Sequence, residues 1–219
     1  MTRAAIVGAS GYAGAELIRI LHTHPDIELG VIAAGSNAGA TLASVHPQFS
    51  SVPELASMVF ATTEPAALTD CDLIFMALPH GESAALVAQL PTDVRIVDLG
   101  ADFRLADAAA WEHYYGGDHA GQWTYGLPEI HGNRERIATE NRVANPGCYA
   151  TAIQLALAPL FADHLAQTDD IVVVAASGTS GAGRSAKVNL LGSEVMGSMS
   201  TYKVGGTHQH TPEIEQSLS

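Results

Sequence analysis

The side chain best suited to covalent chemistry in this sequence is the thiol of Cys148, which directly follows the tripeptide Asn-Pro-Gly. The apolar run from Tyr149 onward is typical of a helix, so the thiol stands where that helix begins. The positive end of a helix macrodipole and its free amide groups stabilise a thiolate there. Gly147 leaves room for a substrate to approach. We therefore interpret Cys148 as a nucleophile.

A free cysteine is more commonly a small buried apolar side chain. Cys71 precedes an apolar run and fits that interpretation. The two cysteines form no CxxC motif and no disulfide framework, so we expect a reducing compartment, the cytoplasm.

A thiolate mechanism also needs a group that moves protons, and His208 and His210 are the candidates. They stand just before a helix that we expect Thr211 to cap, and Glu213 in its first turn could orient one of them. An HxH pair beside a glutamate is also a possible metal site. No third set of ligands has clear spacing, and we expect no metal.

A glycine-rich turn joins an apolar strand, about residues 4–7, to a helix near the beginning of the chain. This context is typical of dinucleotide binding, because glycines let a pyrophosphate approach the amides at the helix start. The spacing is GxxGxxG instead of the usual GxGxxG. The residues expected to contact the cofactor are Gly8, Ser10, Gly11, Tyr12, Ala13 and Gly14. The following helix is expected to carry Ala13, Leu17, Ile20 and Leu21 on its apolar side.

The end of the second expected strand, 27–36, favours NADP over NAD. NAD sites usually place an acidic residue there to hold the ribose 2′-hydroxyl, and this chain has Gly35, Ser36 and Asn37. Ser36 could donate to a 2′-phosphate, although no arginine accompanies it, and it could equally shape a turn. His80, in the LPHG segment that closes another apolar run, either lines the cofactor cleft or is structural.

The loop Ser177 to Arg184, SGTSGAGR, follows an expected strand, 170–178. Its amides could form an anion-binding nest in which Arg184 holds a phosphate or carboxylate. We expect Ser177 and Gly178 to contact the cofactor. The alternative is a flexible surface loop.

Alternation of apolar runs with helical patterns predicts an α/β fold with a doubly wound parallel sheet. Strands are expected in 71–81 and 94–104, with helices in 81–91 and 151–165. The texture changes near Asn145, so we expect a dinucleotide-binding Rossmann domain, 1–145, and a second α+β substrate domain, 146–219. The last helix has about two turns, and we expect the chain to hold only the beginning of that domain.

The composition excludes several classes of partner. The net charge is −13, from 10 Lys and Arg against 23 Asp and Glu, without a basic run. A nucleic acid or an anionic membrane is therefore not an expected partner. No apolar run reaches about 18 residues, and no signal-peptide layout is present.

Taken together, the motifs resemble those of the N-acetyl-gamma-glutamyl-phosphate reductases of arginine biosynthesis. The motifs are VGASGYAGAEL, LPHG, DLGADFRL, YGLPEI, NPGCYATA, SGTSGAGR and GGTHQHTPEIEQ. This resemblance implies NADPH-dependent reduction of an acyl phosphate to an aldehyde by a cytoplasmic homo-oligomer. It implies a nucleophilic Cys148, an acid/base role for His210 or His208, and a thioester intermediate.

We expect the substrate or its phosphate to contact a further set of polar residues, which comprises Asn145, Arg184, Arg104 and Glu213. The chain departs from the family pattern at Gly35, where an arginine is often found. Two alternatives stay open: a sibling reductase acting on aspartyl or aminoadipyl phosphate, and a nucleotide-binding fragment without catalysis.

Overall fold

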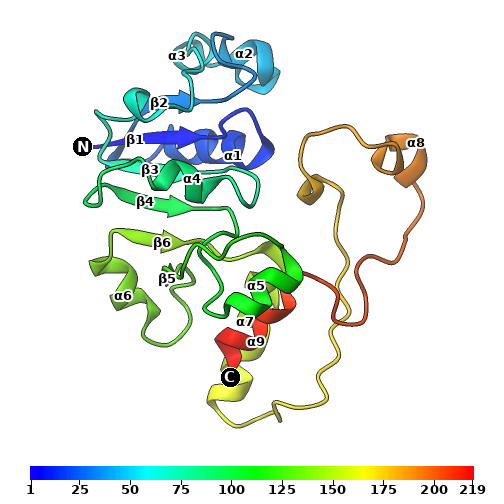
Figure 1. Ribbon diagram of the computed structural model, residues 1–219. Helices are drawn as coiled ribbons and strands as arrows, with labels where there is room; N and C mark the ends of the chain where they lie inside the picture. Colours follow the sequence, from blue (N-terminus) through cyan, green and yellow to red (C-terminus); the bar gives the residue numbers. More distant parts are fainter.

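A six-stranded sheet forms the centre of the protein, as a computed structural model that describes residues 1–219 shows (Figure 1). The strands follow the order β2-β1-β3-β4-β6-β5, and every neighbouring pair is parallel. They are β1 (Thr2–Val7), β2 (Ile27–Ala33), β3 (Leu73–Met76), β4 (Arg95–Asp98), β5 (Thr124–Tyr125) and β6 (Arg142–Ala144). The predicted doubly wound parallel sheet is confirmed.

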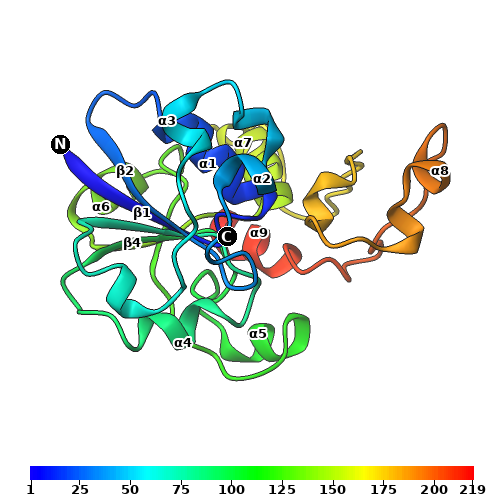
Figure 2. The same ribbon diagram turned by 90° about the horizontal axis from the view of Figure 1, so that it is seen from above.

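Helices cover both faces of this sheet, with α1 and α7 on one side and α4 and α5 on the other (Figure 2). The α-helices are α1 (Tyr12–Leu21), α2 (Leu42–Val45), α3 (Pro53–Ala56), α4 (Ser83–Val87), α5 (Ala108–Tyr114), α6 (Asn133–Thr139), α7 (Cys148–Ala162), α8 (Gly192–Val195) and α9 (Thr211–Leu218). Four short 3-10 helices span Pro47–Phe49, Pro65–Ala67, Ser180–Ala182 and Val188–Leu190. None of the helices is long and apolar enough to cross a membrane.

The apolar core lies on both faces of the central strands. Successive side chains of a strand point to opposite faces, and both faces of β1 are buried. Ala4 and Ile6 pack with α1 in one apolar cluster, whereas Ala5 and Val7 pack with Leu86 of α4 in the other. The continuous apolar runs of the sequence are therefore explained by a sheet that is covered on both sides.

Parallel pairing brings the carboxyl ends of the strands to one edge of the sheet. The glycine-rich turn follows β1, the LPHG segment follows β3, and the Asn-Pro-Gly-Cys segment follows β6. Segments that are distant in sequence thus meet at one edge, where open α/β sheets bind ligands.

The apolar side of α1 differs from the prediction. Of the four predicted residues, Leu21 is buried and Leu17 packs partly buried against the core, but Ile20 is half exposed and Ala13 is exposed. Gly14 and Ile18 are buried in their place. Gly14 has to face inward because α1 begins so close to the preceding turn that a Cβ at this position would lie 2.5 Å from the Cα of Ala9. That contact fixes the rotation of the helix, which an apolar pattern alone does not.

The expected strand at 170–178 is not formed. These residues are exposed and make no backbone hydrogen bond to one another or to the sheet. Their β-branched pattern is real, but a strand forms only where a second strand satisfies its amides and carbonyls. The segment between α7 and α9 instead stands away from the sheet and carries α8 (Figure 1). The predicted division into domains 1–145 and 146–219 stays a prediction.

We predict that Gly14→Ala destabilises the protein by about 1–3 kcal/mol, the usual cost of inserting a methyl group into closed packing. Its Cβ would lie 2.6 Å from the carbonyl oxygen of Gly8 as well as against Ala9. Gly11→Ala is the control, because its Cβ would meet nothing closer than 3.4 Å. Thermal unfolding followed by circular dichroism measures both. A Gly14 variant as stable as the Gly11 variant would contradict the packing argument.

Candidate active site

Cys148 is the first residue of α7, and Gly147 is its N-cap. The predicted helix after the Asn-Pro-Gly segment is therefore confirmed, and it includes the cysteine itself. The Thr151 amide and hydroxyl both donate to the carbonyl of Gly147, at 2.8 and 2.9 Å, and this closes the first turn. Cys148 is exposed, whereas Cys71 is buried in the core. The site thus presents one accessible thiol at a helix N-terminus.

His210 packs directly on the residue that precedes this cysteine. A Cβ at Gly147 would lie 2.3–2.7 Å from three atoms of the His210 ring, so only glycine allows this contact. The backbone amide of His210 donates to Nδ1 of His208 at 3.0 Å. The ring of Tyr149 lies 4.7 Å from the ring of His208, measured between centroids. Both histidines expected from the sequence therefore lie beside the start of α7.

The end of the chain forms α9, and its N-cap is His210 instead of the expected Thr211. The helix begins one residue earlier than the capping pattern predicts. No side chain caps it, because the imidazole of His210 lies on Gly147.

Burial keeps His210 neutral. Together with the nearby positive charges of Arg104, His208 and Lys203, it lowers the pKa of His210 to about 3 from the usual 6.5. The pKa of His208 is also lowered by burial and by Lys203. The imidazole is therefore in the form that can accept a proton, but a pKa this low makes it a weak base in this structure, since a general base works best with a pKa near the working pH.

Glu213 is fully buried, one turn into α9. Its Oε1 accepts hydrogen bonds from the hydroxyl of Tyr125 at 2.6 Å and from the amide of Gly147 at 2.7 Å. Gln154 of α7 donates to its backbone carbonyl at 3.0 Å. Glu213 accepts no hydrogen bond from either of the histidines that it was expected to orient, and Nδ1 of His210 is buried without a partner.

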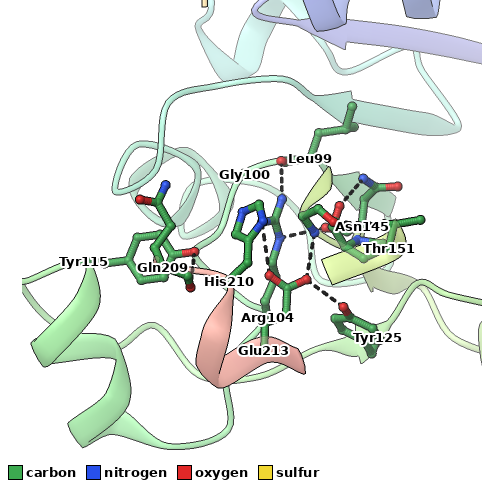
Figure 3. Close-up of polar contacts among 12 residues, drawn as sticks. Leu99, Gly100, Arg104, Tyr115, Tyr125, Asn145, Thr151, Gln209, His210 and Glu213 are labelled. Atoms are coloured by element: carbon green, nitrogen blue, oxygen red, sulfur yellow. Dashed lines mark hydrogen bonds and ion pairs between the residues drawn. The ribbon is translucent and has the colours of Figure 1, made fainter. Parts of the chain in front are cut away.

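Arg104 neutralises this carboxylate. Its Nη1 lies 3.5 Å from Oε2 of Glu213, and both side chains are buried (Figure 3). Its Nε and Nη2 donate to the backbone carbonyls of Asn145 and Leu99, at 2.7 and 2.8 Å. Removing one member of such a pair typically costs about 3–5 kcal/mol. Arg104 and Glu213, expected to contact the substrate, are thus engaged with the protein in this structure.

Two aspartates of the DLGADFR segment were missed as site-supporting residues. Asp98 ends β4 and accepts hydrogen bonds from the Ser83 hydroxyl and the Gly100 amide, at 2.8 and 2.9 Å. Burial raises its pKa to about 6. Asp102 accepts from the Gly81 amide at 2.6 Å and so holds the LPHG segment. The available signal was the presence of two acidic residues at the end of an apolar strand, because a buried carboxylate requires hydrogen-bond partners.

Tyr125 and Gln154 were also missed. Tyr125 belongs to the YGLPEI motif and lies on β5, and Gln154 is a polar residue in an apolar helix. Both are buried, and the hydroxyl of Tyr125 lies 3.1 Å from Oε1 of Gln154. A polar side chain inside an apolar helical run was the signal for Gln154, because a buried amide requires partners.

The glycine-rich turn has a shape that fits a dinucleotide. Gly8 has a φ of +82°, and a Cβ there would lie 2.3 Å from the carbonyl oxygen of Ala77, beyond β3. Gly11 is the N-cap of α1, without a side chain over the free amides. Ser36 and His80 are exposed at the same edge of the sheet, and the ring of His80 lies 5.5 Å from that of Tyr115.

Arg184 contacts this turn. Its guanidinium donates to the backbone carbonyls of Ser10 and Val45, at 3.0 and 2.7 Å. A cavity of about 240 Å³, lined by Tyr12, Arg184 and Lys187 among others, lies between α1 and the loop. Ser177 and Gly178 are exposed in the segment that leads to it. The structure thus links Arg184 to the glycine-rich turn, and its expected contact with a substrate stays a prediction.

Two family models match the chain. The NAD-binding domain of semialdehyde dehydrogenase matches residues 3–140, and the dimerisation domain of semialdehyde dehydrogenase matches residues 148–219. The first match supports a nicotinamide cofactor, and the second supports oligomerisation.

Curated relatives are similar over almost the whole chain. An N-acetyl-gamma-glutamyl-phosphate reductase of Acidothermus cellulolyticus is 62% identical over 217 residues, which are 99% of this chain and 62% of the relative. The protein of the same name from Salinispora arenicola is 64% identical, over 98% of this chain and 63% of the relative. The chain therefore spans somewhat less than two thirds of the length of these relatives.

Solved structures share the fold. Aspartate semialdehyde dehydrogenase from Candida albicans, solved with NADP, superposes with a TM-score of 0.52 at 16% identity, over 74% of this chain and 47% of that one. The enzyme of the same name from Francisella tularensis also gives 0.52, at 14% identity, over 75% of this chain and 42% of that one. From its fold and its family-model matches, the chain belongs to the semialdehyde dehydrogenase family.

Proposed function

We propose that this chain carries the cofactor turn and the reactive thiol of an N-acetyl-gamma-glutamyl-phosphate reductase. The observation that carries the proposal is the exposed thiol of Cys148 at the start of α7, with the neutral imidazole of His210 packed on the preceding residue. The names and the identity of the curated relatives support the choice of substrate.

Cys148 is the nucleophile in this mechanism. Its thiolate attacks the acyl carbon of the acyl phosphate, the carbon–oxygen bond to the phosphate breaks, and a thioester remains. NADPH, when bound, supplies the hydride that reduces the thioester. His210 moves the proton as the aldehyde forms and the thiol is released. The amide of Gly147 is engaged by Glu213, which leaves the first amides of α7 and the side chain of Asn145 as donors to the developing oxyanion.

The cofactor is proposed to be NADP(H). Its pyrophosphate would lie on the turn Gly8 to Gly14, at the amides that begin α1. Ser36 is exposed, and no carboxylate stands at the end of β2, so this place would accommodate the 2′-phosphate of NADP(H). Arg184 at the same turn adds a positive charge next to the site.

We also propose that the enzyme is a cytoplasmic homo-oligomer with an acyl phosphate substrate. The segment after α7 exposes apolar side chains, among them Val172, Val174 and Met199, which a second copy could cover. Residues 1–145 would bind the cofactor, and 146–219 would supply the nucleophile, the histidines and the contact surface.

The test is the reverse reaction, the phosphate-dependent oxidation of a semialdehyde. We expect N-acetylglutamate semialdehyde to be oxidised faster than aspartate semialdehyde, with a lower KM for NADP+ than for NAD+. Absorbance of the reduced cofactor measures both. A preference for another semialdehyde would assign the chain to a sibling reductase. Cofactor binding without oxidation of any semialdehyde would leave a nucleotide-binding module.

The thiols can be distinguished by alkylation. We expect iodoacetamide to modify Cys148 well before Cys71 in the native protein, because Cys71 is 7% exposed and burial raises the pKa of its thiol. Phosphate or substrate should slow the reaction. Cys148→Ser should keep the fold and cofactor binding but lose aldehyde formation. Mass spectrometry of peptides measures labelling, and earlier labelling of Cys71 argues against the covalent mechanism.

The two histidines are expected to have different effects. We predict that His210→Asn lowers turnover by about 10²-fold or more, the scale of a lost general acid or base. His208→Asn should act mainly on KM, since it is the ring of His210, and not that of His208, which lies nearest Gly147. Steady-state kinetics of both variants measures turnover and KM. A larger loss of turnover in His208→Asn than in His210→Asn would exchange the two roles.

A further inference from the structure

The carboxylate of Glu213 joins three parts of the protein at one point. It accepts from the Gly147 amide at the start of α7 and from the Tyr125 hydroxyl of β5. Its second oxygen faces Arg104, from the loop after β4. Arg104, Tyr125 and Glu213 are at most 7% exposed and Gly147 is buried, so water does not compete for the contacts.

Both candidate reactive side chains belong to residues near the contacts of this carboxylate. Cys148 directly follows Gly147, whose amide Glu213 binds. His210 is the N-cap of α9, three residues before Glu213 (Figure 3). Its ring rests on Gly147. A shift of the Glu213 contact therefore moves the start of α7 relative to the start of α9.

We propose that Glu213 is a positioning residue, which holds the helix start that carries Cys148 against the helix start that carries His210. This role rests on the proposed function, since it concerns the same thiol and imidazole. It does not need Glu213 to contact the substrate, and its burial excludes such contact in this structure.

The charge of Glu213 forms part of this role. The titratable groups that face it are Arg104, Tyr125 of β5 and Tyr115, which directly follows α5. His210, three residues before Glu213, lies on Gly147. Burial raises the pKa values of both tyrosines, and they stay neutral, as does His210. Arg104 is then the one ionised partner. Loss of the carboxylate charge leaves Arg104, whose Nε donates to the carbonyl of Asn145 three residues before Cys148, without its counter-charge. An uncompensated cation favours nearby anions.

Stability alone does not account for an ion pair at this place. A buried pair is often no more stabilising than apolar side chains of similar volume. A glutamine would also keep an acceptor oxygen for Gly147 and Tyr125. The charge and the length of the side chain can therefore be tested separately.

The experiment compares Glu213→Gln, which removes the charge, with Glu213→Asp, which keeps the charge but shortens the reach. Glu215→Gln, at an exposed position of the same helix, is the matched control. Each variant is assayed for turnover, for NADPH affinity, for thermal unfolding and for the rate of Cys148 alkylation as a function of pH.

We expect both Glu213 variants to lose turnover by about 10²-fold, the scale of a misplacement of reacting groups by about 1 Å. NADPH affinity should not change. The alkylation profile should move to lower pH in Glu213→Gln and stay in place in Glu213→Asp. Should Glu213→Gln not fold, Tyr125→Phe replaces it, with slower turnover and an unmoved profile expected.

Glu213→Gln with the turnover and alkylation profile of the parent would overturn the proposal. So would turnover that falls only in proportion to folded protein, with no change of the profile, because Glu213 would then be a core residue only. A parent without turnover on any semialdehyde would refute the proposed function instead, and the alkylation profiles would still decide whether Glu213 acts on Cys148.

Discussion

The buried carboxylate of Glu213 is the contact on which the geometry of the site depends. From residue 162 to residue 207 the chain is exposed apart from two half-buried side chains, and only the hydrogen bonds of Arg184 and of the Gly206 carbonyl tie it to residues before α7. The chain returns to the sheet through the contacts of Glu213 with Tyr125, Gly147 and Arg104. Gln154 and Gln216 add hydrogen bonds beside them. A few directional polar contacts thus bring His210 onto the residue before Cys148.

The loop between β4 and α5 makes these contacts possible, because its charged side chains point in different directions. Asp102 holds the segment after β3, near the cofactor edge, whereas Arg104 holds α9 and the segment before Cys148. Burial of a charge is tolerated only with partners, and backbone amides and carbonyls supply most of them here. In this member of the semialdehyde dehydrogenase family, one short loop therefore links the LPHG segment after β3 to the segment before Cys148.

Local patterns predicted the parts of the fold that depend on local physics. The glycine-rich turn, the parallel strands and the helix that begins at Cys148 follow from backbone freedom, apolar period and capping. The same patterns were wrong where a distant partner decides. The side chains of Ala13 and Ile20 are exposed because Gly14 faces the turn, and residues 170–178 form no strand because no neighbour pairs with them.

The sequence alone was sufficient to single out Cys148, His208 and His210 as the candidate reactive residues, because their chemistry and their places at helix starts are local properties. Only the tertiary structure showed that Glu213 is enclosed by protein and meets Gly147, 66 residues away, and Tyr125, 88 residues away. Such pairs leave no trace in a local pattern, because they depend on how α7, α9 and the sheet pack. The candidate reactive side chains, and Glu213 near them, were therefore readable from the sequence, but the contacts of Glu213 with Gly147 and Tyr125 were not.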